Sequence, residues 1–324
     1  MTVTRLNVAA IVGPTATGKS ELAVEVAERL GAEIVSVDSM QIYRGMDAGT
    51  AKPPPDLLGR IPHHLIDEID PSHSLTVAEF QELGRSAIED IARRGSLPLL
   101  VGGSGLYYRA IVDDLVFPPT DESVRSALES QAEELGAEGL HARLRVLDER
   151  AAAKIEPGNI RRTVRALEVI ELTGRPFSDN SAAWDRYESR YHLRAAGLER
   201  ARVQLRERVA ARVDLMLAAG LVDEASDLNK RGTLSRSARM ALGYRQVLDA
   251  GDDADVSEIR ESIVQATVRF ARRQEAWFRA DPRIVWFDAS RPDLLEAVTT
   301  VLSGSHPSSS SSSTRKSMDP SSSV

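Results

Sequence analysis

Cysteine is absent from this chain of 324 residues, which excludes disulfide frameworks, thiolate metal sites and cysteine nucleophiles. Long apolar runs are also absent, since nothing approaches the roughly 18 uninterrupted apolar residues that cross a membrane. The first apolar stretch, residues 8–12, leads into a glycine-rich loop instead of a signal-cleavage site. With 42% hydrophobic and 27% charged residues, the composition is typical of soluble globular proteins. We therefore expect a folded cytoplasmic protein without a membrane segment.

A strongly basic composition is missing as well. The formal net charge is −7, which argues weakly against nucleic acid as a partner. The charge is uneven, however, because residues 1–158 carry a net charge of −10 and residues 159–280 carry +4. Binding of a polyanion depends on the local field, so a nucleic-acid face remains open in this basic middle part.

The beginning of the chain predicts a unit of strand, helix and strand. Residues 6–12 and 33–37 are short apolar runs, and residues 21–30 between them have apolar positions at helical spacing. Such a βαβ unit is almost always right-handed and places its strands in parallel. Further strands are expected at residues 64–66, 97–101, 191–197 and 283–287.

Several helices are predicted around these strands. Thr76 and Glu79 form a capping-box pattern that opens a helix ending near Arg94. Residues 41–75 are polar and proline-rich, which is typical of a long functional loop. Further helices are expected to begin near residue 106 and to cover residues 199–219, 235–250, 257–280 and 290–302. Trp277 and Phe278, near the end of the last long helix, are expected in the core.

The chain divides into three parts by composition. From Pro118 to about residue 190 the sequence has charged helical segments and no strands, which predicts an all-helical insertion at 119–190. Residues 1–118 and 191–302 then form the α/β core. The last part, 303–324, holds 12 serines in 22 residues and is expected to be disordered because it cannot bury apolar area.

A glycine-rich motif follows the first predicted strand. It reads Gly13, Pro14, Thr15, Ala16, Thr17, Gly18, Lys19 and Ser20, and it matches the phosphate-binding pattern G-x-x-x-x-G-K-[ST]. In such a loop the backbone N–H groups converge on phosphate oxygens, Lys19 neutralises them and the Ser20 hydroxyl ligates Mg²⁺. A plain glycine turn is the alternative, but the motif lies between a strand and a helix. We therefore predict an α/β fold with a P-loop NTPase-like parallel sheet flanked by helices.

The ligand of this loop is a separate question. Nucleotide hydrolases also need an Asp or Glu at the end of a later strand for the Mg²⁺ shell, whereas residues 97–101 run into Gly102-Gly103-Ser104-Gly105. The second strand instead leads to Asp38, at the carboxyl edge where open α/β sheets bind ligands. Asp38 could alternatively cap a turn, as strand-end Asp often does.

Five further segments make a resemblance to a known family specific. They are SVDSMQIYRGMDAGTAKP at 36–53, HHLID at 63–67, LPLLVGGSGLYY at 97–108, RALEVIELTGRP at 165–176 and RRQEAWFR at 272–279. Over residues 9–288 the chain resembles the tRNA dimethylallyltransferase family, also called isopentenyl-diphosphate:tRNA isopentenyltransferase. The resemblance implies transfer of a dimethylallyl group from dimethylallyl diphosphate to N6 of adenosine 37, beside the tRNA anticodon, with Mg²⁺ as cofactor.

The resemblance also assigns roles at the donor site. Asp38 matches the family's general base, which would take a proton from the N6 amine. Ser104 stands where the family often has Thr and would orient Asp38 or the leaving oxygen. Arg208 and Arg212 lie one helical turn apart, and their helix is expected to add a cation to the diphosphate site, with Arg212 preferred. A solvated charged face is the alternative for this arginine pair.

The expected tRNA contacts come from three segments. They are Asp38, Ser39, Met40 and Gln41, then Arg161, Arg162 and Arg165 near the end of the insertion, and Arg245 after the Gly243-Tyr244 pair. Gln41 is a candidate for reading a base edge, and the arginine cluster would contact phosphates of the anticodon stem-loop. An ordinary exposed helix face is the alternative for this cluster. No obligate protein partner is indicated.

Two other enzyme classes share some of these features. A P-loop small-molecule kinase would have the same first βαβ unit, but the missing strand-end carboxylate and the motifs after residue 36 argue against it. An adenylate isopentenyltransferase would differ only in its acceptor, and the helical insertion with its arginines favours a macromolecular one. A non-catalytic RNA-binding module leaves the phosphate loop unexplained.

Overall fold

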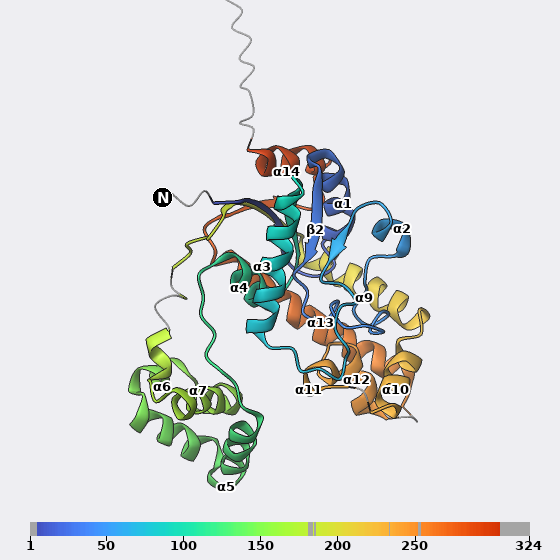
Figure 1. Ribbon diagram of the computed structural model, residues 1–324. Coiled ribbons are helices and arrows are strands. Elements are labelled where there is room, and N and C mark those ends of the chain that lie inside the picture. The colour runs from blue at the N-terminus through green and yellow to red at the C-terminus, as the bar shows by residue number, and fades with distance from the viewer. Residues whose placement is uncertain (1–4, 181–183, 185, 233, 252–253, 305–324) are drawn as a thin grey trace, which may run out of the picture.

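The computed structural model describes residues 5–180, 184, 186–232, 234–251 and 254–304 (Figure 1). Six strands form one parallel sheet in the order β3-β2-β4-β1-β5-β6. They are β1 (Asn7–Val12), β2 (Ala32–Ser36), β3 (His63–His64), β4 (Leu97–Gly102), β5 (His192–Glu199) and β6 (Ile284–Asp288). The predicted α/β class and the parallel sheet flanked by helices are therefore confirmed.

The helices before the second half of the sheet are α1 (Lys19–Leu30), α2 (Pro55–Leu58), α3 (Val77–Arg93), α4 (Gly105–Val112), α5 (Glu122–Leu147), α6 (Glu149–Lys154) and α7 (Ile160–Thr173), followed by the 3-10 turn η1 (Phe177–Asn180). Helices α1, α3 and α4 begin within two residues of their predicted starts, whereas no start was predicted for the others. The capping box at the start of α3 is confirmed, because Thr76 accepts from the Glu79 N–H while the Glu79 carboxylate accepts from the Thr76 N–H.

The remaining helices correct one prediction. They are α9 (Arg202–Ala218), α10 (Leu221–Lys230), α11 (Arg236–Arg239), α12 (Tyr244–Ala250), α13 (Val256–Arg279) and α14 (Leu294–Ser303). A single helix over residues 235–250 was wrong, because Gly243 has φ 94° and separates α11 from α12. Gly220, with φ 91°, begins the unpredicted α10 in the same way. None of the helices in the described ranges is long and apolar enough to span a bilayer.

Side chains alternate between the two faces of the sheet. Val8, Ala10 and Val12 of β1 pack into one cluster with residues of α3, α4, α9 and α13. Ala9 and Ile11 face the other way, toward α1 and α14. Both faces are thus covered by helices, and the carboxyl ends of β1, β2 and β4 remain as the edge where loops gather.

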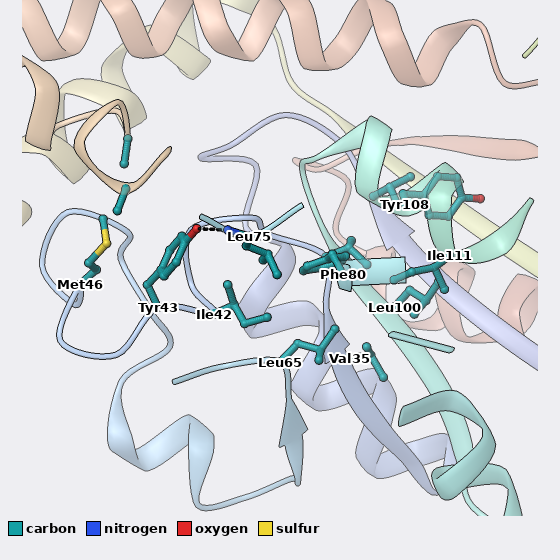
Figure 2. Close-up of a cluster of buried hydrophobic side chains, with 14 of the residues drawn as sticks. Val35, Ile42, Tyr43, Met46, Leu65, Leu75, Phe80, Leu100, Tyr108 and Ile111 are labelled. Carbon is teal, nitrogen blue, oxygen red and sulfur yellow. Dashed lines mark hydrogen bonds between the residues drawn. The ribbon is translucent and has the colours of Figure 1, made fainter. Parts of the chain in front are cut away.

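The connection from β2 to α3 is less polar than its sequence indicates. It buries Ile42, Tyr43, Met46 and Leu65 in the same cluster as Phe80 of α3 and Leu100 of β4. Figure 2 shows Ile42 and Leu65 on the side of this cluster toward the sheet, with Met46 further out. The Tyr43 hydroxyl accepts a hydrogen bond from the Leu75 backbone N–H at 3.4 Å (Figure 2). The long loop is therefore anchored in the core, which holds Asp38 and its neighbours in place. Phe278 is buried as predicted, but Trp277 is 38% exposed, so the core prediction for Trp277 was wrong.

Helices α5, α6 and α7 lie apart from the sheet, at the lower left of Figure 1. They bury their own cluster, which includes Leu128, Leu140, Leu144 and Leu167. The predicted helical insertion is confirmed, while its exact limits at 119 and 190 remain a proposal. Disorder was predicted for residues 303–324; this was wrong at Ser303, which is the last residue of α14, and residues 305–324 lie outside the described residues.

Candidate active site

Two glycines of the phosphate-binding loop, residues 13–20 (the P-loop), stand at positions where other residues would clash or be strained. Gly13 has φ 137°, and a Cβ there would lie 2.4 Å from the backbone oxygen of Leu198 on β5. Gly18 has φ 95° and precedes α1, whose first turn has no side-chain cap. The loop therefore passes close to the sheet and presents the N-terminus of α1, which is a favourable place for an anion.

Lys19 folds back onto the loop. Its Nζ donates to the Pro14 carbonyl oxygen at 2.6 Å, and the Thr17 hydroxyl donates to the same oxygen at 2.9 Å. Burial and, next, the charge of Arg212 lower the pKa of Lys19 to about 7, against the opposing effects of Asp38 and Glu21. Asp38 and Glu21 compensate the charge of Lys19 only weakly, so an anionic ligand bound beside Nζ would stabilise the charged form of Lys19.

Two arginines of α9 face the loop. The Arg208 Nε donates to the Ala16 carbonyl oxygen at 2.9 Å, so it fixes the outer side of the P-loop. Arg212, one turn further on, donates to the Thr50 carbonyl oxygen at 3.4 Å. Burial lowers the pKa of Arg212 from its ordinary value, and the neighbouring Asp38 carboxylate opposes this shift. A guanidinium keeps its proton at neutral pH, so Arg212 supplies a fixed positive charge there.

Asp38 lies just beyond β2 and is half-buried. Its Oδ1 accepts a hydrogen bond from the Met40 N–H at 2.9 Å, and its own N–H donates to the Ser36 hydroxyl at 3.4 Å. The turn-capping alternative therefore describes a real contact, but it uses one carboxylate oxygen only. The turn holds the carboxylate at the carboxyl edge of the sheet.

A cavity of about 1000 Å³ joins most of the predicted site. Among the predicted residues it is lined by Thr15, Lys19, Ser20, Asp38, Ser39, Met40, Gln41, Ser104, Arg161, Arg212 and Arg245. The other predicted residues, Gly13, Pro14, Ala16, Thr17, Gly18, Arg162, Arg165 and Arg208, do not line it. The P-loop, the strand-end carboxylate and an arginine of the insertion thus share one space.

Several of the predicted tRNA-binding residues have internal partners, among them Gln41 and Arg165. The Gln41 amide oxygen accepts from the Ser36 hydroxyl at 3.0 Å, so base reading by Gln41 would require it to exchange partners. Arg165 donates to the carbonyl oxygens of Pro118 and Pro119 and forms an ion pair with buried Glu168 at 2.7 Å. Arg165 therefore fastens the insertion to its linker, and its contact with tRNA stays a prediction.

Some residues of the site were not predicted. Gln274 of α13 bonds to the P-loop and to the loop after β4. Glu224 accepts from the Asp47 N–H at 3.1 Å and from the Tyr244 hydroxyl, which clamps the loop that carries Thr50. The Gln274 contacts and the Glu224–Asp47 contact join residues more than one hundred positions apart in the sequence. Nothing in the pattern of α10, α12 or α13 marks the side chains that make them. Gln274 does lie in a segment that carries the family resemblance, which was the one available signal.

The site residues suit a magnesium ion that is shared with a diphosphate. The described residues contain no group of three or more His, Asp or Glu placed to hold a metal by themselves. Mg²⁺ commonly takes one or two protein oxygen ligands and completes its shell with phosphate oxygens and water. Ser20, half-buried at the cavity wall and next to Lys19, offers such an oxygen.

The lowered pKa of Lys19 predicts a pH dependence of diphosphate binding. Above pH 7 the free Lys19 is largely neutral, and an anion bound beside Nζ restores the charged form, so binding takes up a proton. We expect uptake approaching one proton near pH 8, measured by calorimetry with Mg²⁺ and inorganic diphosphate in buffers of different ionisation enthalpy.

The Lys19→Arg variant is the matched control, because its guanidinium stays charged in the free protein. It should bind diphosphate without this proton uptake. Equal proton uptake by both proteins would remove Lys19 as the source of the pH dependence.

Comparison with known proteins agrees with this geometry. A family model described as IPP transferase matches residues 41–281, and one described as isopentenyl transferase matches residues 6–74. The tRNA dimethylallyltransferase of Streptomyces coelicolor is 51% identical over 299 residues, which are 92% of this chain and 95% of that relative.

Solved structures give the same result. The tRNA isopentenylpyrophosphate transferase of Bacillus halodurans is 40% identical with a TM-score of 0.68, covering 92% of this chain and 96% of its own. A eukaryotic dimethylallyltransferase acting on tRNA is 25% identical with a TM-score of 0.73, covering 90% and 77%. From the P-loop to the end of α13, this chain belongs to the tRNA dimethylallyltransferase family.

Proposed function

We propose that this protein transfers a dimethylallyl group from dimethylallyl diphosphate to the exocyclic N6 amine of adenosine 37 in tRNA. One observation carries the proposal: a single cavity joins Lys19 and Ser20 of the P-loop, the Asp38 carboxylate and Arg161 of the helical insertion. The first two groups suit a diphosphate, the third suits an amine, and the fourth suits a polyanionic acceptor.

In the proposed reaction the N6 nitrogen attacks C1 of the dimethylallyl group. A C–N bond forms, the C–O bond to the diphosphate breaks, and the N6 proton passes to the Asp38 carboxylate. The backbone N–H groups of the loop, Lys19 and Arg212 would stabilise the charge that develops on the diphosphate, where preorganised donors contribute most to rate. Mg²⁺, held by Ser20 and the diphosphate oxygens, would neutralise part of that charge.

The acceptor must leave the anticodon loop to reach this site. A stacked base would hide its N6 amine from a donor seated on the P-loop, so adenosine 37 is expected to be extruded into the cavity. Residues 1–118 and 191–302 would then hold the donor, and residues 119–190 would bind tRNA from outside. We also propose a cytoplasmic location, because the proposed acceptor is tRNA.

Isotope transfer tests the proposed reaction directly. The protein is incubated with radiolabelled dimethylallyl diphosphate and Mg²⁺, and with either bulk tRNA or AMP. Label should appear in tRNA. Label in AMP alone would favour the adenylate isopentenyltransferase alternative. Transfer to neither, with vigorous ATP turnover, would favour the P-loop kinase.

The arginines of α7 give a prediction for tRNA binding. Arg161 and Arg162 are exposed in its first turn, whereas Arg165 is bonded to the linker, so a triple replacement would also loosen the insertion. The double variant Arg161→Ala/Arg162→Ala should weaken binding of all substrate tRNAs alike. The log–log salt slope should flatten by about 0.7 to 0.9 per phosphate contact.

Arg29→Ala/Arg93→Ala provides the matched control. These two arginines lie in the last turns of α1 and α3, near the opposite edge of the sheet. Filter binding over a salt series measures both doubles, and diphosphate affinity should not change in either. If the Arg161→Ala/Arg162→Ala protein keeps the affinity and salt slope of the control, these arginines belong to a solvated face.

A further inference from the structure

Gln274 lies on α13 and joins two loops of the active site. Its Oε1 accepts a hydrogen bond from the Thr15 backbone N–H at 2.9 Å. Its Nε2 donates to the Gly103 carbonyl oxygen, also at 2.9 Å. Thr15 belongs to the P-loop, and Gly103 stands beside Ser104. One side-chain amide thus spans the gap between the diphosphate-binding loop and the Ser104 loop, residues 103–104.

The fit between Gln274 and Gly103 is tight. Gln274 is only 6% exposed, and a Cβ at position 103 would lie 2.3 Å from its Nε2. No side chain other than hydrogen can therefore stand at 103 while the amide keeps its place. The two partners also fix the orientation of the amide, since a backbone N–H needs an acceptor and a carbonyl oxygen needs a donor.

The Gln274 bridge lies just beyond the end of the sheet, where two loops of the active site begin. The pairing of β1 with β4 ends at Val12 and Gly102, so the sheet's own hydrogen bonds stop where the two loops begin. Gln274 supplies a connection just past this point. Gln274 and its neighbour Arg273 both line the active-site cavity, so the helix that sets the loop spacing also forms a wall of the site.

We propose that Gln274 is a positioning residue that holds the P-loop and the Ser104 loop at a fixed separation, so that the bound diphosphate and Ser104 face each other during transfer. The activity part of this inference rests on the proposed function. Misplacement of a reacting group by about 1 Å can cost about 100-fold in rate, so a bridge of this kind affects the chemical step more than binding.

The test compares Gln274→Met with Gln265→Met. Met has nearly the length of Gln without its amide, and Gln265 is exposed on the same helix, so the pair isolates the buried hydrogen bonds. Gln274→Met should lower the single-turnover rate at saturating donor and tRNA about 10- to 100-fold. Its diphosphate affinity should fall only about 2- to 10-fold, and its tRNA affinity should not change. Gln265→Met should match the unmodified protein in all three.

Gly103→Ala reaches the same bridge from its other end. The added Cβ should displace the Gln274 amide, whereas Gly158→Ala, where a Cβ meets nothing within 4 Å, is its control. Both changes break the same contact between Gln274 and Gly103. The double variant Gly103→Ala/Gln274→Met should therefore lose no more rate than the worse single variant. Hydrogen exchange of the Thr15 amide in the P-loop should accelerate in each variant, while exchange of the α13 amides stays slow.

Three results would contradict the role proposed for Gln274. A Gln274→Met rate within about threefold of the unmodified protein, or losses that multiply in the double variant, would overturn the proposal. So would a rate loss that equals the loss of folded protein in a thermal unfolding curve. If Gln274→Met does not fold, Gly103→Ala carries the same test. If the unmodified protein transfers no label to tRNA, the proposed function fails by itself, and Thr15 exchange and diphosphate affinity still decide the role of Gln274.

Discussion

The Asp38→Asn variant is expected to lose about 10²- to 10⁴-fold in the single-turnover rate of prenyl transfer, the usual loss when a positioned general base is removed. Asn keeps an oxygen that can accept the Met40 N–H, so the turn after β2 should persist. It lacks the basicity needed to take the proton that the N6 amine sheds as the C–N bond forms. Binding of tRNA should change far less. The measurement is rapid mixing of enzyme, tRNA and donor at enzyme excess.

Two controls accompany this variant. Asp249→Asn changes another carboxylate in the same cavity, one that is paired with Arg245 at 3.1 Å, and it should leave the chemical step nearly unchanged. Ser104→Ala should be milder than Asp38→Asn, because it removes an orienting hydroxyl and leaves the base. An Asp38→Asn rate within about threefold of the unmodified enzyme would remove Asp38 from the mechanism.

The position of Asp38 was predictable because it depends on short-range pattern and on topology. An apolar run ending at residue 37 places the next side chain at a strand end, and parallel strands bring all such ends to one edge. The P-loop is local in the same sense, since its glycines, Lys19 and Ser20 are consecutive. Only the handedness and order of the strands are needed to place Asp38 near it.

The parts that sequence reasoning missed depend on distant partners. Gln274 contacts Gly103 and Thr15, which lie 171 and 259 positions away, and its helix reads as an ordinary charged helix. Gly243 sits within a favourable helical pattern, and the helix breaks there because the fold holds Gly243 at φ 94° and ψ −62°, outside the helical region. The burial of Ile42 and Met46 was likewise hidden by the polar residues around them.

The electrostatics of the donor site also depend partly on local sequence and partly on distant residues. The motif predicts that Lys19 binds phosphate, but its low pKa arises from burial and from Arg212 on α9, almost two hundred residues away. Opposite signs therefore meet at one point only after folding: Asp38 lies near two cations that have lost part of their hydration. This arrangement favours an anionic donor beside Lys19 and Arg212 and, next to it, an acceptor amine that contacts Asp38.

The Lys19→Ala variant should lose about 10²- to 10³-fold or more in kcat/KM for dimethylallyl diphosphate, the range typical of removing one preorganised donor from a developing anion. The loss should be larger in rate than in diphosphate affinity, because Arg212, Arg208 and the N-terminus of α1 still attract the ground-state anion. Binding of tRNA should not change. Steady-state transfer to tRNA, with diphosphate affinity measured separately by calorimetry, gives both quantities.

Lys19→Met separates the effect of the missing charge from that of the missing side-chain stem. Lys19 donates to the Pro14 carbonyl oxygen, so its removal frees one loop contact, and Met keeps the buried stem. Equal losses in the Ala and Met variants would place the effect in the missing charge, whereas recovery in the Met variant would place it in packing of the loop. Lys230→Ala, exposed at the end of α10, should retain full activity. ATP hydrolysis that stops with Lys19→Ala, together with unchanged prenyl transfer, would contradict the assignment of this loop to the allylic diphosphate.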